Sequence, residues 1–368
     1  MVIKSVDSKR SVPTPSVSSA RVEAPALPAV AQQPAVDSGF QSAKQKLVNM
    51  TGRHKPVAMA GDAALAGSVA AQLRVAQAGG VGGTTVGKGK PKVDAAVTDF
   101  LKEACRQTTG DLKQAYADLK KAVDAGDWGT AAKKAKALLS GKADDQAEAI
   151  DEALGLSGTK STEALIAQLD FLSKLEAAGV KADCPPTEAQ LVQYFGTLKK
   201  DPRGAREAFA AYAEAFHVHP ADAGQGDRDI AYTKGDSRVP ESWGEVTGEK
   251  AKGQPAHLGK HVNDCEGYAF LAETLLGAAG FTVAHHLTTH GGPAGDHGMV
   301  SFKHPQEKGY TLTSNGHVLT GKDERALAIE GFNQASPKPA TKDLRFYTGA
   351  TMLESQERAG AHDKKHSV

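Results

Sequence analysis

The sequence predicts an α+β protein whose parts differ in character along the chain. We expect a disordered basic arm over residues 1–92, an all-helical middle domain over 93–218, a C-terminal domain over 219–355 and a polar tail over 356–368. Three observations support this division. The first part lacks bulky apolar residues, the second repeats them at helical spacing, and the third changes to strand-like alternation. In the third part we expect a helix packed on an antiparallel sheet.

The N-terminal arm is too poor in large apolar side chains to bury a core. Its one aromatic residue is Phe40, and it is rich in Ala, Pro, Ser and Gly, so burial cannot offset the entropy of ordering it. It has twelve Lys and Arg against four Asp and Glu. These charges are scattered and no aromatic residues are interleaved with them, which argues against a nucleic-acid partner.

No apolar stretch of the chain has the length of a signal peptide or a membrane span. We therefore expect no conventional export signal and no membrane partner. The predicted location is the cytoplasm, or outside the cell after export by a specialised bacterial secretion system.

The middle part shows helical periodicity from Val93 onward, and Gly, Pro or Ser divides it into six or seven segments. The segment from Asp111 to Ala125 is typical, because its apolar residues fall on one face and it stops at Gly126. We expect these helices to form a domain that could bind a protein partner.

Three cysteines at wide spacing, Cys105, Cys184 and Cys265, fit neither a disulfide framework nor a CxxC metal site. Cys105 falls on an apolar helix face and Cys184 in a proline-flanked loop, so both are interpreted as structural.

Cys265 is placed differently, at the first turn of a predicted helix. Asn263 or Asp264 can cap this helix, and Gly280 can end it. A helix N-terminus favours the thiolate, which is the nucleophilic form of cysteine. The alternative is a small buried core cysteine.

A base for this thiol is predicted at His297, which opens one of the expected strands. The strands are predicted over 281–287, 299–303, 310–313 and 317–320. An imidazole titrates near neutrality and can both take and return a proton. Thr313 and Asn315 are the candidates to orient its ring, since they share a strand face. Asn315-Gly316 is also a strong hairpin-turn signal, and both roles for Asn315 remain open.

The segment Asn-Asp-Cys-Glu-Gly-Tyr-Ala at 263–269 resembles the Gly-Asp-Cys-Glu-Asp-Tyr-Ala signature of bacterial transglutaminase-like cysteine enzymes of the papain-like superfamily. Residues 296–300 resemble the strand that bears their histidine. Residues 308–312 resemble the strand that usually carries an aspartate, and in this chain that strand has no aspartate. The resemblance covers only the C-terminal part of the chain.

The resemblance implies a papain-like fold with Cys265 as nucleophile, His297 as base and Asn315 as the orienting residue. It also implies that the indole of Trp243 assists the amide of Cys265 in binding an oxyanion. The expected reaction is thiol-dependent acyl transfer on a protein or peptide substrate, without a cofactor. Deamidation, crosslinking and proteolysis share the first half of this reaction, in which the thiolate attacks a carbonyl and a thioester forms. The alternative is a noncatalytic interaction protein built on a degenerate scaffold of this kind.

The same region is rich in histidine, and imidazole and carboxylate groups are suitable zinc ligands. The candidates for a zinc site are His285, His286, His290, His297 and His304 with Asp296. Their spacing fits no established zinc pattern. Adjacent residues of a strand point to opposite faces, so His285 and His286 could not readily ligate one ion. We expect no metal.

Overall fold

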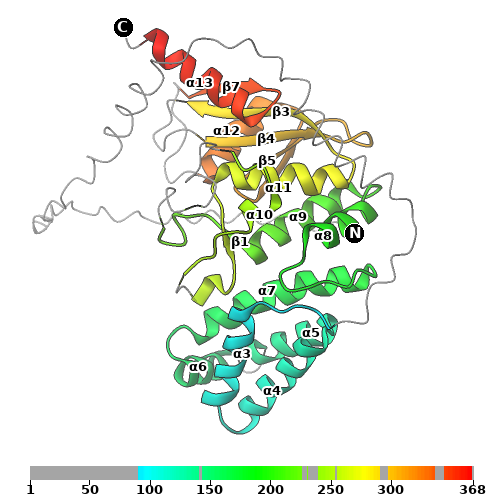
Figure 1. Cartoon of the computed structure of the whole chain (residues 1–368), viewed down its shortest axis with the longest axis vertical. Coiled ribbons are helices and arrows are strands. Elements are labelled where there is room, and N and C mark those ends of the chain that lie inside the picture. Colours follow the sequence, from blue (N-terminus) through cyan, green and yellow to red (C-terminus); the bar gives the residue numbers. More distant parts are fainter. Residues whose placement is uncertain are drawn as a thin grey trace, which may run out of the picture. The chain divides into compact units, whose positions relative to one another are not determined.

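The computed structural model describes residues 90–140, 143–225, 230, 239–252, 255–290, 297–335 and 344–366 (Figure 1). The disordered arm expected over residues 1–92 lies outside the described residues except for its last three positions. Among the described residues, no helix has the length and apolar character needed to span a bilayer.

Seven helices occupy the expected helical stretch. They are α3 (Ala95–Gln107), α4 (Gly110–Ala125), α5 (Trp128–Leu139), α6 (Ala143–Leu154), α7 (Gly158–Ala177), α8 (Glu188–Thr197) and α9 (Pro202–Phe216). Their boundaries follow from capping. Asp94, Asp127 and Asp201 each accept a backbone N–H in the first turn of their helix, and Gly126 ends α4 in the left-handed conformation at φ 71°.

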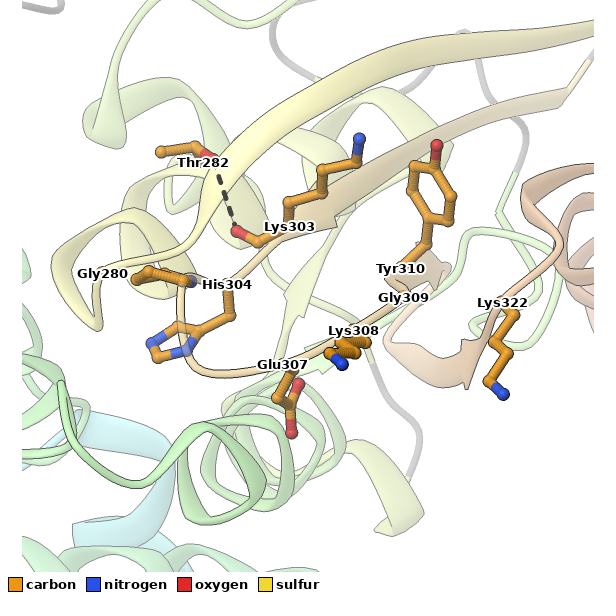
Figure 2. Close-up of a pocket in the computed structure, with 10 residues that line it drawn as sticks. Gly280, Thr282, Lys303, His304, Glu307, Lys308, Gly309, Tyr310 and Lys322 are labelled. Carbon is orange, nitrogen blue, oxygen red and sulfur yellow. Dashed lines mark hydrogen bonds between the residues drawn. The ribbon is translucent and has the colours of Figure 1, made fainter.

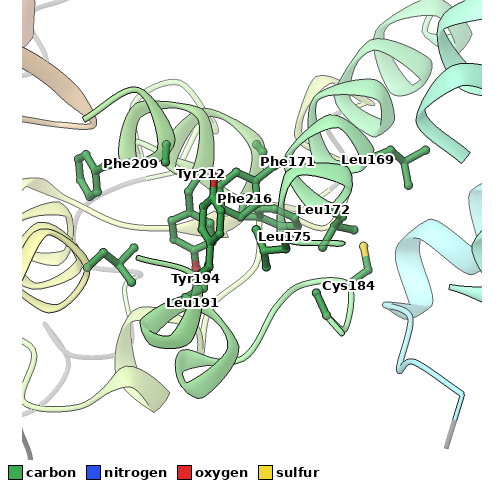
Figure 3. Packing of buried hydrophobic residues seen from close by; sticks show 14 of the residues in the cluster. Leu169, Phe171, Leu172, Leu175, Cys184, Leu191, Tyr194, Phe209, Tyr212 and Phe216 are labelled. Atoms are coloured by element: carbon green, nitrogen blue, oxygen red, sulfur yellow. The ribbon is translucent and has the colours of Figure 1, made fainter. Parts of the chain in front are cut away.

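Aromatic side chains join the last three of these helices. The ring of Phe171 on α7 lies 5.9 Å from that of Tyr194 on α8, and 5.3 Å and 5.9 Å from those of Tyr212 and Phe216 on α9 (Figure 3). Cys184 belongs to the same apolar cluster, and burial raises the pKa of its thiol to about 12. Its surroundings therefore fit the structural role expected for it.

The C-terminal part contains the expected antiparallel sheet, so the prediction of mixed helix and sheet is confirmed. Its order is β6-β5-β4-β3-β7. The strands are β3 (Thr282–His290), β4 (His297–Lys303), β5 (Tyr310–Ser314), β6 (His317–Gly321) and β7 (Arg345–Gly349). The last of these was not predicted. The short strands β1 (His217–Val218) and β2 (His261–Val262) form a separate parallel pair, and α10 (Trp243–Val246) and a 3₁₀ turn (Pro255–His257) lie between them in sequence.

Helices cover both faces of the sheet, as contacts of consecutive β3 residues show. His285 bonds Glu324 of α12 (Glu324–Ala335), whereas His286 bonds Glu273 of α11 (Cys265–Ala278). The two imidazoles therefore point to opposite faces, as expected. Thr288, on the same face as His286, bonds Ser355 of α13 (Met352–His366) at 2.6 Å. Helices α11 and α13 thus share one face, and α12 covers the other.

Two expectations about the boundaries change. One cluster of buried apolar residues runs from Val97 on α3 to Val300 on β4 and Met352 on α13, so residues on both sides of the boundary expected at 218 share a core. The polar tail expected from 356 is instead the body of a helix, α13 (Met352–His366), because Met352, Ser355 and Ala359 bury one side of it.

Candidate functional site

The start of α11 is fixed from both sides of Cys265. The carboxylate of Asp264 is the N-cap and accepts the N–H groups of Glu266 and Gly267, each at 3.1 Å. Behind it, the buried Asn263 amide donates to the carbonyl of Val246 at 2.9 Å. Of the two caps considered, Asp264 is therefore the one used, and Cys265 is the first residue of the helix.

Two groups contact the Cys265 thiol. Sγ donates to Oε2 of Glu266 at 2.8 Å, and the backbone N–H of Gly298 on β4 is directed at the sulfur. A Cβ on Gly298 would lie 3.7 Å from Sγ and 3.1 Å from the sulfur of Met352, so glycine permits this close approach. The other oxygen of Glu266 accepts Nε2–H of Gln356, on α13, at 2.5 Å.

The resting thiol is protonated. Burial raises its pKa well above the usual range, and the negative charges of Glu266 and Asp264 add to the effect, while the Gly298 N–H opposes it. Burial and the charge of Asp264 also raise the pKa of Glu266, to about 8. The helix N-terminus alone was expected to favour the thiolate. Burial of the sulfur, with Asp264 and Glu266 beside it, reverses that preference.

His297 begins β4, and its ring is held by Ser314 at the end of β5. Nε2 lies 2.8 Å from Oγ of Ser314, and that hydroxyl donates to the carbonyl of Gly331 on α12 at 2.9 Å. A hydroxyl has one proton, so Ser314 must accept from His297, which places the ring proton on Nε2. Burial, with the nearby charge of His219, lowers the pKa of His297 to about 4. The ring is therefore neutral, with its lone pair on Nδ1.

The side chain that bonds the His297 ring is Ser314, not Asn315 or Thr313, which corrects the predicted contact. Ser301 of β4 pairs with Leu312 of β5, so His297 and Ser314 fall on that same face by alternation. Thr313 lies on the other face, where its hydroxyl donates to the carbonyl of Val300 at 3.4 Å. The predicted candidates alternate with Ser314 along the strand, so a difference of one position placed the expected orienting group on the wrong face of the sheet.

Asn315 serves the hairpin turn instead. It adopts φ 46°, and Gly316 follows at φ 83°, which is the conformation of the two-residue turn that Asn-Gly favours. The buried Oδ1 of Asn315 has no hydrogen-bond partner in the described part of the chain. Of the two roles left open for Asn315, the structure supports the turn.

The structure brings the Cys265 thiol to the strand end that carries His297 but does not bond the two groups. Within the described residues, no hydrogen bond joins Sγ to the imidazole. The residue that follows His297, Gly298, directs its N–H at the sulfur, so the backbone around His297 lies next to the thiol. His297 and Gly298 are consecutive in β4, so they point to opposite faces. The imidazole lies with Ser314 on the α12 face, whereas the thiol lies by Gly298 on the face of α11 and α13, bonded to Glu266.

Trp243, expected to assist an oxyanion, begins α10 and stacks on the ring of Tyr212 at 6.4 Å. The hydroxyl of Tyr212 in turn bonds Nε2 of His217, and Nδ1 of His217 accepts a hydrogen bond from the side-chain amide of Asn263 at 2.8 Å. No hydrogen bond from the indole to Cys265 is present among the described residues. Trp243 is thus connected to the start of α11 through packed rings.

Four residues of this site were not predicted: Ser314, Glu266, Gln356 and His219. Glu266 follows Cys265 in the chain and Ser314 lies between the two predicted candidates, so sequence reasoning could have weighed both. Gln356 carried no signal, because its segment was interpreted as a tail. His219 follows a strand of only two residues, which no periodicity marks.

The histidine-rich region offers no metal cluster within the described residues, where no group of three or more His, Cys, Asp or Glu side chains could hold an ion. His285 and His286 are each paired with a glutamate. Asp296 and the side chain of His290 lie outside the described part.

Comparison with known proteins finds no family model, no curated protein and no solved structure that matches the chain.

Proposed function

We propose that the C-terminal part is a transglutaminase-like, papain-like cysteine enzyme that transfers acyl groups through a thioester on Cys265. One observation carries this proposal. Ser314 accepts a hydrogen bond from Nε2 of His297, which leaves the Nδ1 lone pair as the basic site, and the thiol lies at the same strand end, where the N–H of Gly298 meets it. Thiol and imidazole must then approach each other around that strand end. Nucleophile, base and orienting residue then come from a helix start and two adjacent strands, as the sequence resemblance implies.

The reaction begins when the thiol leaves Glu266 and turns to His297. Nδ1 takes the thiol proton as Sγ attacks the carbonyl carbon of a carboxamide or peptide. The backbone N–H of Cys265 is the natural first donor to the oxyanion that forms, and the indole of Trp243 remains the proposed second donor. When the tetrahedral intermediate collapses, the C–N bond breaks, the imidazolium gives its proton to the leaving amine, and a thioester remains.

Water or a second amine then attacks the thioester, passes a proton to Nδ1, and releases the thiol. Water after attack on a glutamine side chain gives deamidation, an amine gives crosslinking, and water after attack on a backbone amide gives proteolysis. The resemblance favours the first two. The substrate is a protein or peptide, and no step needs a cofactor.

The test uses the full chain with a glutamine-containing protein substrate. Ammonia release reports attack on glutamine, and incorporation of a fluorescent primary amine reports transamidation. We expect Cys265→Ala to abolish both signals and His297→Ala to reduce them by about a hundredfold or more. Cys105→Ala, which removes a thiol far from this motif in the chain, is the matched control and should retain activity.

The noncatalytic alternative makes a different prediction. It is favoured by the high pKa of the Cys265 thiol, which holds the sulfur in its unreactive form. If the wild-type chain releases neither ammonia nor new peptide termini, and Cys265→Ala leaves binding to every partner unchanged, the enzyme proposal is wrong and the fold is an interaction scaffold.

A further inference from the structure

A second site lies at the far end of α11 from Cys265. Gly280 follows the helix there, and a 14-residue helix separates this end from the thiol by about 20 Å. A pocket of about 770 Å³ opens between the start of β3, the loop from β4 to β5 and the end of β6. Figure 2 shows the side chains that line it, which include three lysines.

The three lysines, Lys303, Lys308 and Lys322, give the pocket an uncompensated positive charge. All are exposed, and none forms an ion pair within the described residues. Lys303 is placed by Tyr310, whose ring centroid lies 4.8 Å from its Nζ. Positive side chains around one pocket that have no ion-pair partner favour a ligand that supplies negative charge.

The one carboxylate that lines the pocket does not supply this charge. Glu307 binds the guanidinium of Arg206 on α9, with Nη2 and Oε1 2.9 Å apart, and this pairing holds the pKa of Glu307 below its usual range. Asp323, which follows Lys322, caps α12, where it accepts the N–H groups of Arg325 and Ala326, and it is not among the residues that line the pocket.

His304 provides an independent sign of a missing acceptor. Only 4% of this residue is exposed, and its Nδ1 accepts the N–H of Gln306 at 3.3 Å. In the neutral ring the proton is then on Nε2, and this buried donor has no partner among the described residues. Gly280 lies beside it, with 3.6 Å from Nε2 to the position of a Cβ (Figure 2). A ligand oxygen that reaches Nε2 past this glycine would satisfy the donor.

We propose that this pocket binds a small molecule bearing two or more phosphate groups. Lysine binds phosphate as a point charge, and three lysines match the charge of a diphosphate better than that of a single carboxylate. The volume falls within the range of small-molecule sites, about 300–1,000 Å³. The proposal does not depend on the chemistry of Cys265.

The experiment is isothermal titration of the full-length chain with inorganic pyrophosphate at physiological salt. We expect one saturable site. Lys308→Gln combined with Lys322→Gln should weaken binding about a hundredfold, or about tenfold for each lysine. The matched control combines Lys113→Gln and Lys181→Gln, two exposed lysines without ion pairs in the described part, and it should leave the affinity unchanged.

A third variant tests the buried donor. His304→Phe keeps a ring against Phe281 but removes the Nε2 donor and the long 3.3 Å bond from the exposed Gln306 N–H to Nδ1, which water can replace, so binding should weaken about tenfold while the unliganded Tm stays close to that of wild type. Equal weakening by the two lysine pairs would reduce the effect to general charge attraction and overturn the proposal. The proposal is also overturned if pyrophosphate does not bind. If polyglutamate binds through Lys308 and Lys322 instead, the pocket is a surface for acidic peptides.

Discussion

Ser314→Ala tests the geometry of the candidate site most directly. The hydroxyl is buried and joins two elements, since it accepts Nε2–H of His297 at 2.8 Å and donates to the carbonyl of Gly331 at 2.9 Å. Alanine leaves the imidazole donor without a partner, and an unsatisfied buried donor costs about 1–3 kcal/mol. The Gly331 carbonyl lies inside α12 and can keep a helical partner, so we expect the loss of stability to stay within that range.

Two measurements separate the predicted role of Ser314 from those of its neighbours. Urea unfolding should show the largest cost for Ser314→Ala and less than about 1 kcal/mol for Thr313→Val, whose bond to Val300 is long at 3.4 Å. Asn315→Gly should be neutral or slightly stabilising, because glycine adopts positive φ without strain. If the site is an enzyme, turnover should fall for Ser314→Ala and persist for Asn315→Gly.

Nitrogen NMR of the imidazole reports the ring proton itself. In the wild-type protein we expect the proton of His297 on Nε2, and in Ser314→Ala we expect a growing fraction on Nδ1, because the acceptor that selects the tautomer is gone. A wild-type ring protonated on Nδ1, or a larger cost for Thr313→Val than for Ser314→Ala, would refute the assigned strand face.

Two further predictions concern protonation. Glu266→Gln should speed alkylation of Cys265 about tenfold at pH 9. At that pH the Glu266 carboxylate, with its pKa of about 8, is charged and disfavours the thiolate. At pH 6 the substitution should change the alkylation rate little. Glu273→Gln, on the same helix, is the control, and equal rates for wild type and Glu266→Gln at pH 9 would contradict the electrostatic argument. The folded-state pKa values of His261 and His297 are depressed to about 4 from 6.5, so the unfolded chain binds more protons between these values and stability must fall as pH drops from 6.5 to 4. In urea titrations, His261→Gln should flatten this slope by up to about 1.4 kcal/mol per pH unit, whereas replacement of the exposed His317 should not.

Local patterns were enough to predict the elements that carry strong signals of their own. The helix after Cys265 has a cap and an apolar stripe, and the Asn315-Gly316 turn specifies the hairpin of β5 and β6. Strand β7 and helix α13 have no comparable signal. They depend on contacts with β3, such as the hydroxyl pair of Thr288 and Ser355, which no spacing within their own segments reveals.

The candidate site shows the same limit at the level of single residues. The sequence identified the strand after His297 as the source of an orienting group, but the choice between Thr313 and Ser314 depends on the register of β4 and β5. A one-residue change in that register moves every side chain to the other face. Register is set by turn geometry and by what each face buries, so it could be fixed only once α11 and α12 were known to cover opposite faces.

Helix α13 contributes a side chain to the surroundings of the Cys265 thiol. Gln356 donates to one oxygen of Glu266, and the other oxygen accepts the proton of the Cys265 thiol, so the two bonds together hold the sulfur at Glu266. Any reaction that uses the imidazole therefore has to break the bond between Sγ and Glu266 first. Because Gln356 restrains that carboxyl group, a segment that resembles a solvated tail in sequence takes part in setting the reactivity of a cysteine about 90 residues before it.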